Sequence, residues 1–245
     1  MNTKELNNSI FKGLRNAYAD SRRFNGFINP YVKPEYLLTV NIAQSISSDF
    51  EIQIKLEQST ERLKQESGDK LDVTNIFGYL NDFQEFALIE KLREGRIDIV
   101  LYELDNTAIY PIEIKGFDSV LRNKQFLYSD IDRILIFLLD TSGKSKIKVG
   151  RVVFIQELKP GLKSDIPEST KNVESEYQSL IELIYKDKLE TFKFEVCAEA
   201  IFDNLFETDD EISSYNTDSN DQIGLADILD EKGLYAGIIV NIIKK

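Results

Sequence analysis

Hydrophobic positions in the first quarter of the chain change from helical spacing to strand-like alternation. Over residues 4–24, apolar side chains recur about every four residues, which predicts an amphipathic helix. A second helix is predicted over 34–46, because Pro34 suits the first turn of a helix. Residues 50–57 then alternate apolar and polar side chains, which is typical of a strand with one buried face.

The middle of the chain predicts a β-hairpin that follows a polar connection and a helix. Residues 58–72 are polar and are expected to form a loop with some helix, and 73–93 are expected to form a helix. Two strands are predicted at 96–103 and 108–116, and the turn-forming residues at 104–107 join them.

After the hairpin the pattern predicts a helix over about 119–132. The segment RILIFLLD (133–140) contains an unbroken apolar run, which predicts a central strand buried on both faces. Further strands are expected at 150–158 and 192–202, with a helix at 175–189 between them.

The C-terminal part combines an acidic segment with a last helix and a last strand. Residues 207–221 are acidic and almost devoid of apolar side chains, so a flexible loop is expected there. A short helix at 225–233 and a closing strand at 234–243 follow. The order of the elements predicts an α/β fold, in which helices flank a mixed sheet that contains the hairpin.

Residue types that are missing exclude several kinds of chemistry. The chain has no histidine and one cysteine, Cys197. This rules out Ser-His-Asp and Cys-His catalysis, an intramolecular disulfide, and a zinc site built from the usual ligands. Clusters of carboxylates would instead bind hard cations. The sequence contains no run of about 18 apolar residues, which a membrane-spanning helix would need. The first residues do not resemble a secretory signal. A cytoplasmic location is therefore expected.

The net charge of −12 argues against strong binding of nucleic acid, but the charge is unevenly distributed. Residues 199–245 hold 11 Asp and Glu against 3 Lys, whereas the first 34 residues carry a charge of +4. Basic side chains of the first predicted helix could contact a DNA backbone, or they could form a solubilising helix face, which is the favoured interpretation. These side chains are Lys12, Arg15, Arg22 and Arg23.

The predicted hairpin brings four charged side chains to one face. With the turn centred within 104–107, Asp98 lies directly opposite Glu113, and Arg96 lies opposite Lys115. Because side chains alternate along a strand, these four share a face. The other face is expected to be the core face. It is lined by Ile97, Ile99, Ile112 and Ile114.

The chemistry expected of this face follows from its two opposed carboxylates. Carboxylates that face each other repel unless a positive charge compensates them. A Mg²⁺ ion held by Asp98 and Glu113 would do so, because Mg²⁺ takes one or two carboxylates and adds water and phosphate oxygens. Lys115 could orient or deprotonate the attacking water, or stabilise the pentavalent phosphate. The alternative interpretation is a solvated hairpin face with an accidental motif.

At these residues the sequence resembles the PD-(D/E)XK nuclease superfamily, which has the restriction-endonuclease-like fold. The matching pieces are GRIDIVLYE, for the strand with the first acid, and YPIEIKGF, for the strand with the Glu-x-Lys motif. The resemblance covers residues 34–140 and implies an α-β-β-β-α-β core with 133–140 as its last strand. The proline of the family name is absent, since Ile97 precedes Asp98.

The resemblance also implies how the chain is organised. Residues 1–245 would form a single nuclease-like domain. A helical extension at 1–33 would precede the catalytic core at 34–140, and a C-terminal elaboration at 141–245 would contain the acidic loop. Many members of the superfamily dimerise to cut both strands, so a homodimer or higher homo-oligomer is an expectation.

Metal ligands are the next expectation that the resemblance supplies. Asp98 and Glu113 would hold Mg²⁺, with Mn²⁺ able to substitute, and Ile114 is included among the ligands. The family often has a further glutamate on the helix before the sheet, and Glu35, which heads the second predicted helix, is the first candidate. The other candidates for this accessory acid are Glu57, Glu85 and Glu90.

The helix after the Glu-x-Lys strand supplies further candidates. Exonuclease-like branches of the superfamily have a Gln and a Tyr on this helix, and here Gln125 and Tyr128 are one residue closer than in that pattern. Asp130 and Arg133 are spaced i,i+3, and a structural ion pair between them is favoured over contact with phosphate. The candidates for contact with nucleic acid are Arg96, Lys124, Gln125 and Arg133.

Three functions from different classes stay open. The resemblance implies a metal-dependent endonuclease that cleaves DNA, in restriction or another anti-phage role, with RNA as the other possible substrate. A non-catalytic module for binding or assembly is favoured by the net charge of −12 and disfavoured by the intact Asp98, Glu113 and Lys115. A structural protein with an accidental motif is the third.

Overall fold

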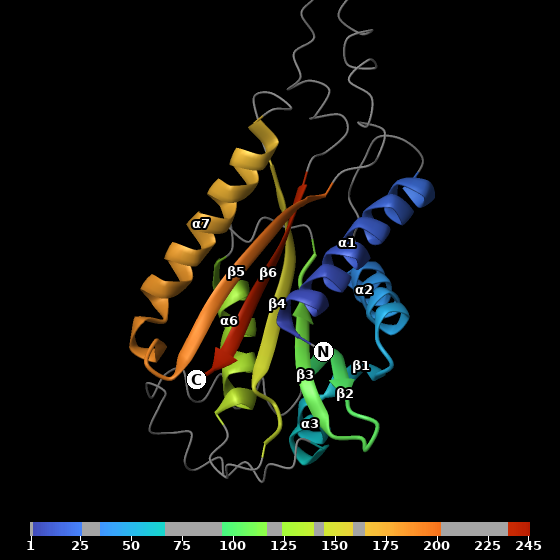
Figure 1. Ribbon diagram of the computed structural model, residues 1–245, viewed down its shortest axis with the longest axis vertical. Helices are drawn as coiled ribbons and strands as arrows, with labels where there is room; N and C mark the ends of the chain where they lie inside the picture. The colour runs from blue at the N-terminus through green and yellow to red at the C-terminus, as the bar shows by residue number, and fades with distance from the viewer. Residues whose placement is uncertain are drawn as a thin grey trace, which may run out of the picture.

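Six strands of the described residues form one mixed sheet with helices on both faces (Figure 1). The computed structural model describes residues 2–25, 35–66, 95–116, 124–139, 145–158, 165–201 and 235–245. The helices are α1 (Thr3–Asn25), α2 (Glu35–Asp49), α3 (Thr60–Glu66), α6 (Lys124–Leu138) and α7 (Ile166–Ile184), with a 3-10 helix at Lys186–Lys188. The strands are β1 (Gln53–Ser59), β2 (Arg96–Tyr102), β3 (Ala108–Ile114), β4 (Val149–Glu157), β5 (Phe192–Ile201) and β6 (Tyr235–Lys244).

The strands follow the order β1-β2-β3-β4-β6-β5, so β1 and β5 form the edges of the sheet. Within the described ranges, β3 and β4 run parallel and every other neighbouring pair is antiparallel. A parallel pair needs a crossover connection, and the chain makes it through α6. The expected α/β class with a mixed, helix-flanked sheet is therefore confirmed.

The predicted β2–β3 hairpin is confirmed, and its expected register holds from Ile99 to Leu101, beyond which the pairing shifts by one residue so that Tyr102 pairs with Ala108. Ile99 pairs with Ile112, and this is the register in which Asp98 and Glu113 occupy opposite positions. The turn between the strands contains Asn106, whose φ of 64° is left-handed. Asparagine tolerates this conformation better than most residues, so the local sequence suits a tight connection.

Two buried clusters lie on opposite faces of the sheet. On one face, α1 and α2 cover a cluster that includes Leu14 and Ile112. On the other face, α6 and α7 cover a cluster that includes Ile131 and Phe154. Because helices cover both faces of the central strands, β3 and β4 are largely buried on both sides, as expected for strands in the middle of a three-layer fold.

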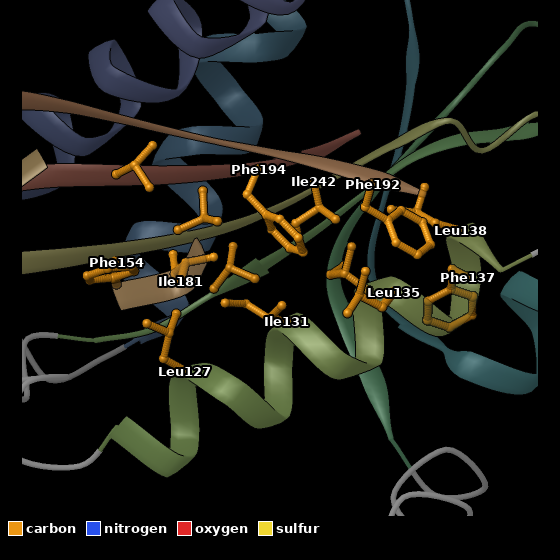
Figure 2. Packing of buried hydrophobic residues seen from close by; sticks show 14 of the residues in the cluster. Leu127, Ile131, Leu135, Phe137, Leu138, Phe154, Ile181, Phe192, Phe194 and Ile242 are labelled. Atoms are coloured by element: carbon orange, nitrogen blue, oxygen red, sulfur yellow. The ribbon is translucent and has the colours of Figure 1, made fainter. Parts of the chain in front are cut away.

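The segment 133–140 is helical as far as Leu138, so its prediction as a buried strand was wrong. The strand that follows α6 is β4, which was predicted separately over 150–158. The apolar run from Ile134 to Leu138 is buried throughout, so this end of α6 is covered all round. A short apolar run of this kind cannot be assigned to a strand or a helix by its pattern alone. The α6 side chains that Figure 2 shows directed toward the sheet include Leu127, Ile131 and Leu135.

Other predicted elements are present with shifted ends. α7 begins at Ile166 rather than at residue 175, and a proline in its first turn marks this start. β1 covers Gln53–Ser59 rather than 50–57. The α1–α2 pair approaches closely at Gly13, where an added Cβ would lie 2.5 Å from the Ile42 Cα.

Several predicted segments lie outside the described residues. These are the helices at 73–93 and 225–233, the start of the helix predicted at 119–132, and the acidic segment 207–221. Among the helices that the structure describes, none has the length and apolar character needed to cross a membrane. The division of the chain at residues 34 and 141 stays a prediction, although β4, β6 and β5 extend the same sheet as β1 to β3.

Candidate active site

Asp98 and Glu113 are held side by side by the backbone of the β2–β3 hairpin. The Asp98 carboxylate accepts a hydrogen bond from the backbone N–H of Ile114 at 2.6 Å. This contact orients the carboxylate toward the strand that carries the Glu-x-Lys motif. Glu113 pairs with Val152 of the parallel strand β4, which restrains its backbone position on that side.

The face that carries these acids is covered rather than open. Glu113 is only 1% exposed, because α6 lies over this side of β3. The expected core face is present, and α6 also buries the part of the opposite face that carries Glu113. Ile99, Ile112 and Ile114 pack on the α1–α2 side as predicted, whereas Ile97 belongs to the cluster on the α6–α7 side.

Ile97 faces the α6–α7 side next to an irregularity in the backbone of β1. Leu56 pairs with Ile99 and Gln58 pairs with Ile97, and Glu57 stands between these pairs with a φ of 52°. A non-glycine residue in the left-handed region costs about 1–2 kcal/mol. The strain lies in the strand next to Asp98, and the Glu57 side chain is exposed.

Two charged residues of α6 complete the group around Glu113. The Arg133 Nη1 lies 2.6 Å from the Glu113 Oε1. The Asp130 Oδ1 lies 3.9 Å from the Arg133 Nη2, so the expected i,i+3 ion pair is present. The second oxygen of Asp130 lies 3.3 Å from the Lys115 Nζ. A chain of alternating charges thus runs from Glu113 through Arg133 and Asp130 to Lys115.

Burial and neighbouring charges shift the pKa values in this group. Burial raises the pKa of Glu113 well above its usual value; Arg133 opposes this shift, while Asp98 and Asp130 add to it. For Arg133, burial opposes the positive charge, but Glu113 and Asp130 outweigh it and the guanidinium pKa is raised. Arg133 therefore favours the ionised form of Glu113, and Glu113 and Asp130 favour the charged form of Arg133.

Lys115 joins the site to the parallel strand. Its backbone N–H donates to the Val153 carbonyl at 2.8 Å, which continues the β3–β4 ladder past the end of β3. The side chain is 30% exposed, whereas Asp130 beneath it is 1% exposed. Among Glu113, Arg133, Asp130 and Lys115, the side chain of Lys115 is thus the most exposed to solvent.

The other residues predicted for the site have mixed outcomes. Glu35 begins α2 and Lys124 and Gln125 begin α6, but their side chains lie outside what the structure describes. Arg96 is exposed, and its backbone carbonyl accepts a 3.4 Å hydrogen bond from Arg133. The alternative accessory acids Glu85 and Glu90 lie outside the described residues.

Basic residues of α1 are engaged with acids of the same chain. Lys12 Nζ lies 2.8 Å from a carboxylate oxygen of Asp49, and Arg15 forms an ion pair with Glu199. Both pairs are solvent-exposed, which agrees with the favoured interpretation of a solubilising face. The side chains of Arg22 and Arg23 lie outside the described set.

Sequence reasoning missed that Arg133 is the partner of Glu113. The spacing of Asp130 and Arg133 was the available signal, and it was assigned to a pair on the helix surface. Their true role depends on how α6 lies on the sheet, which the spacing does not specify. A second arginine, Arg151, was also missed; it is fully buried and donates from its Nε to the Asn7 Oδ1 at 3.1 Å.

The donor set fits a hard divalent cation. Mg²⁺ needs only one or two protein carboxylates, and Asp98 and Glu113 supply two. When all groups are ionised, the three acids exceed the two bases Lys115 and Arg133 by one negative charge. In the described part of the chain, no group of three or more His, Cys, Asp or Glu could hold a metal ion alone. Water and substrate oxygens would therefore have to complete the shell.

Known proteins supply no template for this site. A scan against protein-family models, a search of curated proteins and a search of solved structures each found no match. A function therefore has to be proposed from the geometry and chemistry of the residues and from the resemblance that the hairpin motif carries.

Proposed function

We propose that this protein is a divalent-metal-dependent phosphodiesterase, and most specifically a DNA endonuclease. The observation that carries the proposal is the juxtaposition of Asp98, Glu113 and Lys115 on one side of the β2–β3 hairpin, with Asp98 bonded to the Ile114 backbone at 2.6 Å. Two carboxylates, which are hard ligands for Mg²⁺, and an ammonium group within one partly covered site suit the hydrolysis of a charged phosphate ester.

The residues have separate tasks in this proposal. Asp98 and Glu113, with the Ile114 backbone, would hold Mg²⁺, which supplies charge neutralisation at the phosphate when bound. Lys115 stabilises the additional negative charge that develops on the phosphoryl oxygens, because its ammonium group is the accessible cation. Asp130, 3.3 Å from the Lys115 Nζ, holds that ammonium group at the site.

The proposed reaction is the hydrolysis of a phosphodiester bond. The oxygen of a water molecule forms a bond to phosphorus while one phosphorus–oxygen ester bond breaks. One proton of the water passes to solvent, and the departing alkoxide takes up a proton from solvent. No oxidant, reductant or covalent enzyme intermediate is required.

The order of the elements also supports the proposal. α2, β1, β2, β3, α6 and β4 come in the order that the resemblance to the PD-(D/E)XK superfamily implies, with α3 inserted between β1 and β2 and with β4 in the role expected for residues 133–140. DNA as the substrate, a restriction or anti-phage role, and a homodimer rest on that resemblance alone.

Cleavage of supercoiled plasmid DNA in the presence of Mg²⁺ tests the proposal. The wild-type protein is compared with Asp98→Asn, Lys115→Ala and the control Lys146→Ala. Lys146 also pairs with carboxylates of the hairpin, but it does so at the exposed turn, through Glu103 and Asp105. We expect both site variants to lose about 100-fold or more in rate, and the control to cleave like the wild type.

Two outcomes would contradict the proposal. The first is the absence of Mg²⁺-dependent cleavage by the wild type on plasmid, single-stranded DNA and RNA. The second is equal cleavage by the wild type and the folded Lys115→Ala variant, since a contaminating nuclease would then be responsible.

A non-catalytic binding module is the second candidate. The burial of Glu113 at 1% exposure and its ion pair with Arg133 favour it, because structural ion pairs have the same geometry. Calorimetric titration with Mn²⁺ separates the two candidates. Binding that Asp98→Asn abolishes supports the phosphodiesterase, and the absence of such binding supports the module.

A further inference from the structure

The Arg133 guanidinium occupies an oxygen of Glu113 that the proposed function assigns to a cation. Its Nη1 lies 2.6 Å from the Glu113 Oε1, and the two side chains are 17% and 2% exposed. At such a distance, in a site sheltered from water, a guanidinium and a divalent cation on the same carboxylate would repel each other strongly. The two cations therefore compete for Glu113.

The guanidinium also has a second acid within reach. Asp130 presents Oδ1 at 3.9 Å from the Arg133 Nη2, which is longer than a direct hydrogen bond. Asp130 is 1% exposed and comes from the preceding turn of the same helix, so its carboxylate lies beside the guanidinium in the buried layer between α6 and the sheet. Arg133 can leave Glu113 without losing a carboxylate partner.

We propose that Arg133 is an internal counter-ion of Glu113 that exchanges with the divalent cation. Without the cation, the guanidinium neutralises Glu113 and holds α6 against the hairpin. With the cation, Arg133 moves from Glu113 to Asp130. The inference rests on the proposed function, since it assumes a cation at Asp98 and Glu113, and it adds a positioning residue and a coupled movement to that site.

Binding of Mn²⁺ measured by calorimetry tests the competition without relying on catalysis. The proteins are the wild type, Arg133→Gln and the control Arg62→Gln, since Arg62 is an exposed arginine that also pairs with a glutamate, Glu66. Removing the competing charge should tighten binding by roughly tenfold or more, which is within the usual range of coupled sites. The control should bind like the wild type.

Thermal unfolding gives a second readout. In EDTA, Arg133→Gln should melt below the wild type, because Glu113 has lost its partner. Mn²⁺ should then raise the melting temperature of this variant by more than it raises that of the wild type. If Arg133→Gln does not fold, Arg133→Lys retains the charge with fewer donors, and its Mn²⁺ affinity should lie above that of the wild type.

The movement can be followed in the wild-type protein by NMR of arginine side chains. The Arg133 Nε–H resonance, identified by its loss in the Arg133 variant, should shift on titration with Mg²⁺ while that of Arg62 does not. Unchanged or weaker Mn²⁺ affinity in the folded Arg133 variants, or no shift of this resonance in a wild type that binds the cation, would overturn the exchange alone. Absence of Asp98-dependent Mn²⁺ binding in the wild type would overturn the proposed function and the exchange with it.

Discussion

The side-chain amide of Gln178 accepts a hydrogen bond from the backbone N–H of Val196 at 2.8 Å, and its Nε2 donates to the Phe194 carbonyl at 3.0 Å. An amide from α7 thus makes the two contacts that a further strand would make along the outer edge of β5. Glu174, one turn earlier, accepts from the Ala198 N–H at 2.9 Å. Edge strands with free main-chain groups invite pairing with other chains, and these side chains occupy that edge.

Replacing Gln178 with alanine should increase self-association of the protein. The substitution frees the Val196 N–H and the Phe194 carbonyl for pairing with a second β5 edge. Sedimentation velocity over a range of concentrations should detect a larger associated fraction than in the wild type. Glu176→Ala, an exposed position on the same helix, is the control. Identical sedimentation of all three proteins would contradict this role of Gln178.

Glu113→Gln should gain stability relative to the wild type as the pH rises. The folded protein holds the Glu113 proton more tightly than the unfolded chain, whose value is near 4.5. The wild-type free energy of unfolding therefore falls as the pH rises from that value through the raised pKa, by at most about 1.4 kcal/mol per pH unit. Glutamine does not titrate, so it lacks this loss. Urea denaturation in EDTA across this interval measures the difference.

Glu66 provides a control for the Glu113 experiment, because the stability of its glutamine variant relative to the wild type should change with pH in the opposite direction. Burial raises its pKa, but hydrogen bonds from Tyr102 and Lys55 outweigh burial and the pKa is lowered. The ionised form of Glu66 thus stabilises the fold above the usual glutamate pKa, and this stability is lost on acidification. Glu66→Gln should lose stability relative to the wild type as the pH rises. Parallel behaviour of the two variants would contradict both assignments.

Gly13→Ala should destabilise the protein, although alanine favours helices more than glycine does. The new Cβ would lie 2.5 Å from the Ile42 Cα and 2.8 Å from its backbone nitrogen, so α1 and α2 would have to separate. We expect a loss of about 1–3 kcal/mol, as for other overpacked positions. Asn8→Ala, at an exposed position of α1, should leave stability unchanged or slightly raised. Chemical denaturation compares the three proteins, and a stabilised Gly13→Ala variant would refute the close approach.

Arg151→Met should raise the free energy of unfolding. Arg151 is fully buried, and its two terminal nitrogens have no hydrogen-bond partner among the described residues. Burial lowers the pKa of the guanidinium to about 10, so the charge opposes folding at neutral pH. An apolar side chain of similar length should gain about 1–3 kcal/mol. Arg62→Met, at an exposed position, should have little effect. A loss of stability in Arg151→Met would show that buried partners stabilise the guanidinium.

The hairpin could be predicted from the sequence because its determinants are local. Turn-forming residues, alternating side chains and two short strands specify the pairing of Ile99 with Ile112 without reference to the rest of the chain. The same local logic identified Asp98 and Glu113 as neighbours. It did not reveal that Glu113 is buried, because burial depends on a helix that follows later in the sequence.

The predictions that failed depended on tertiary contacts. Residues 133–140 contain an apolar run that either a central strand or a buried helix end would need, and only packing against the sheet distinguishes the two. The contact between Arg133 and Glu113 spans 20 residues and two kinds of element. The contact follows from the path of the β3–α6–β4 crossover. The sequence pattern instead predicted a strand at 133–140, where α6 continues.

The parallel pairing of β3 with β4 has a consequence for the order of events during folding. The hairpin is made of contacts close in sequence and can form early, whereas β4 can join only after a long loop has closed. An early hairpin would carry Asp98 and Glu113 opposite each other with no positive partner from α6, and their repulsion would weaken it. Docking of the crossover helix then both stabilises the hairpin and creates the site. A nascent chain would therefore assemble the candidate site late, in the same step that commits it to its native topology.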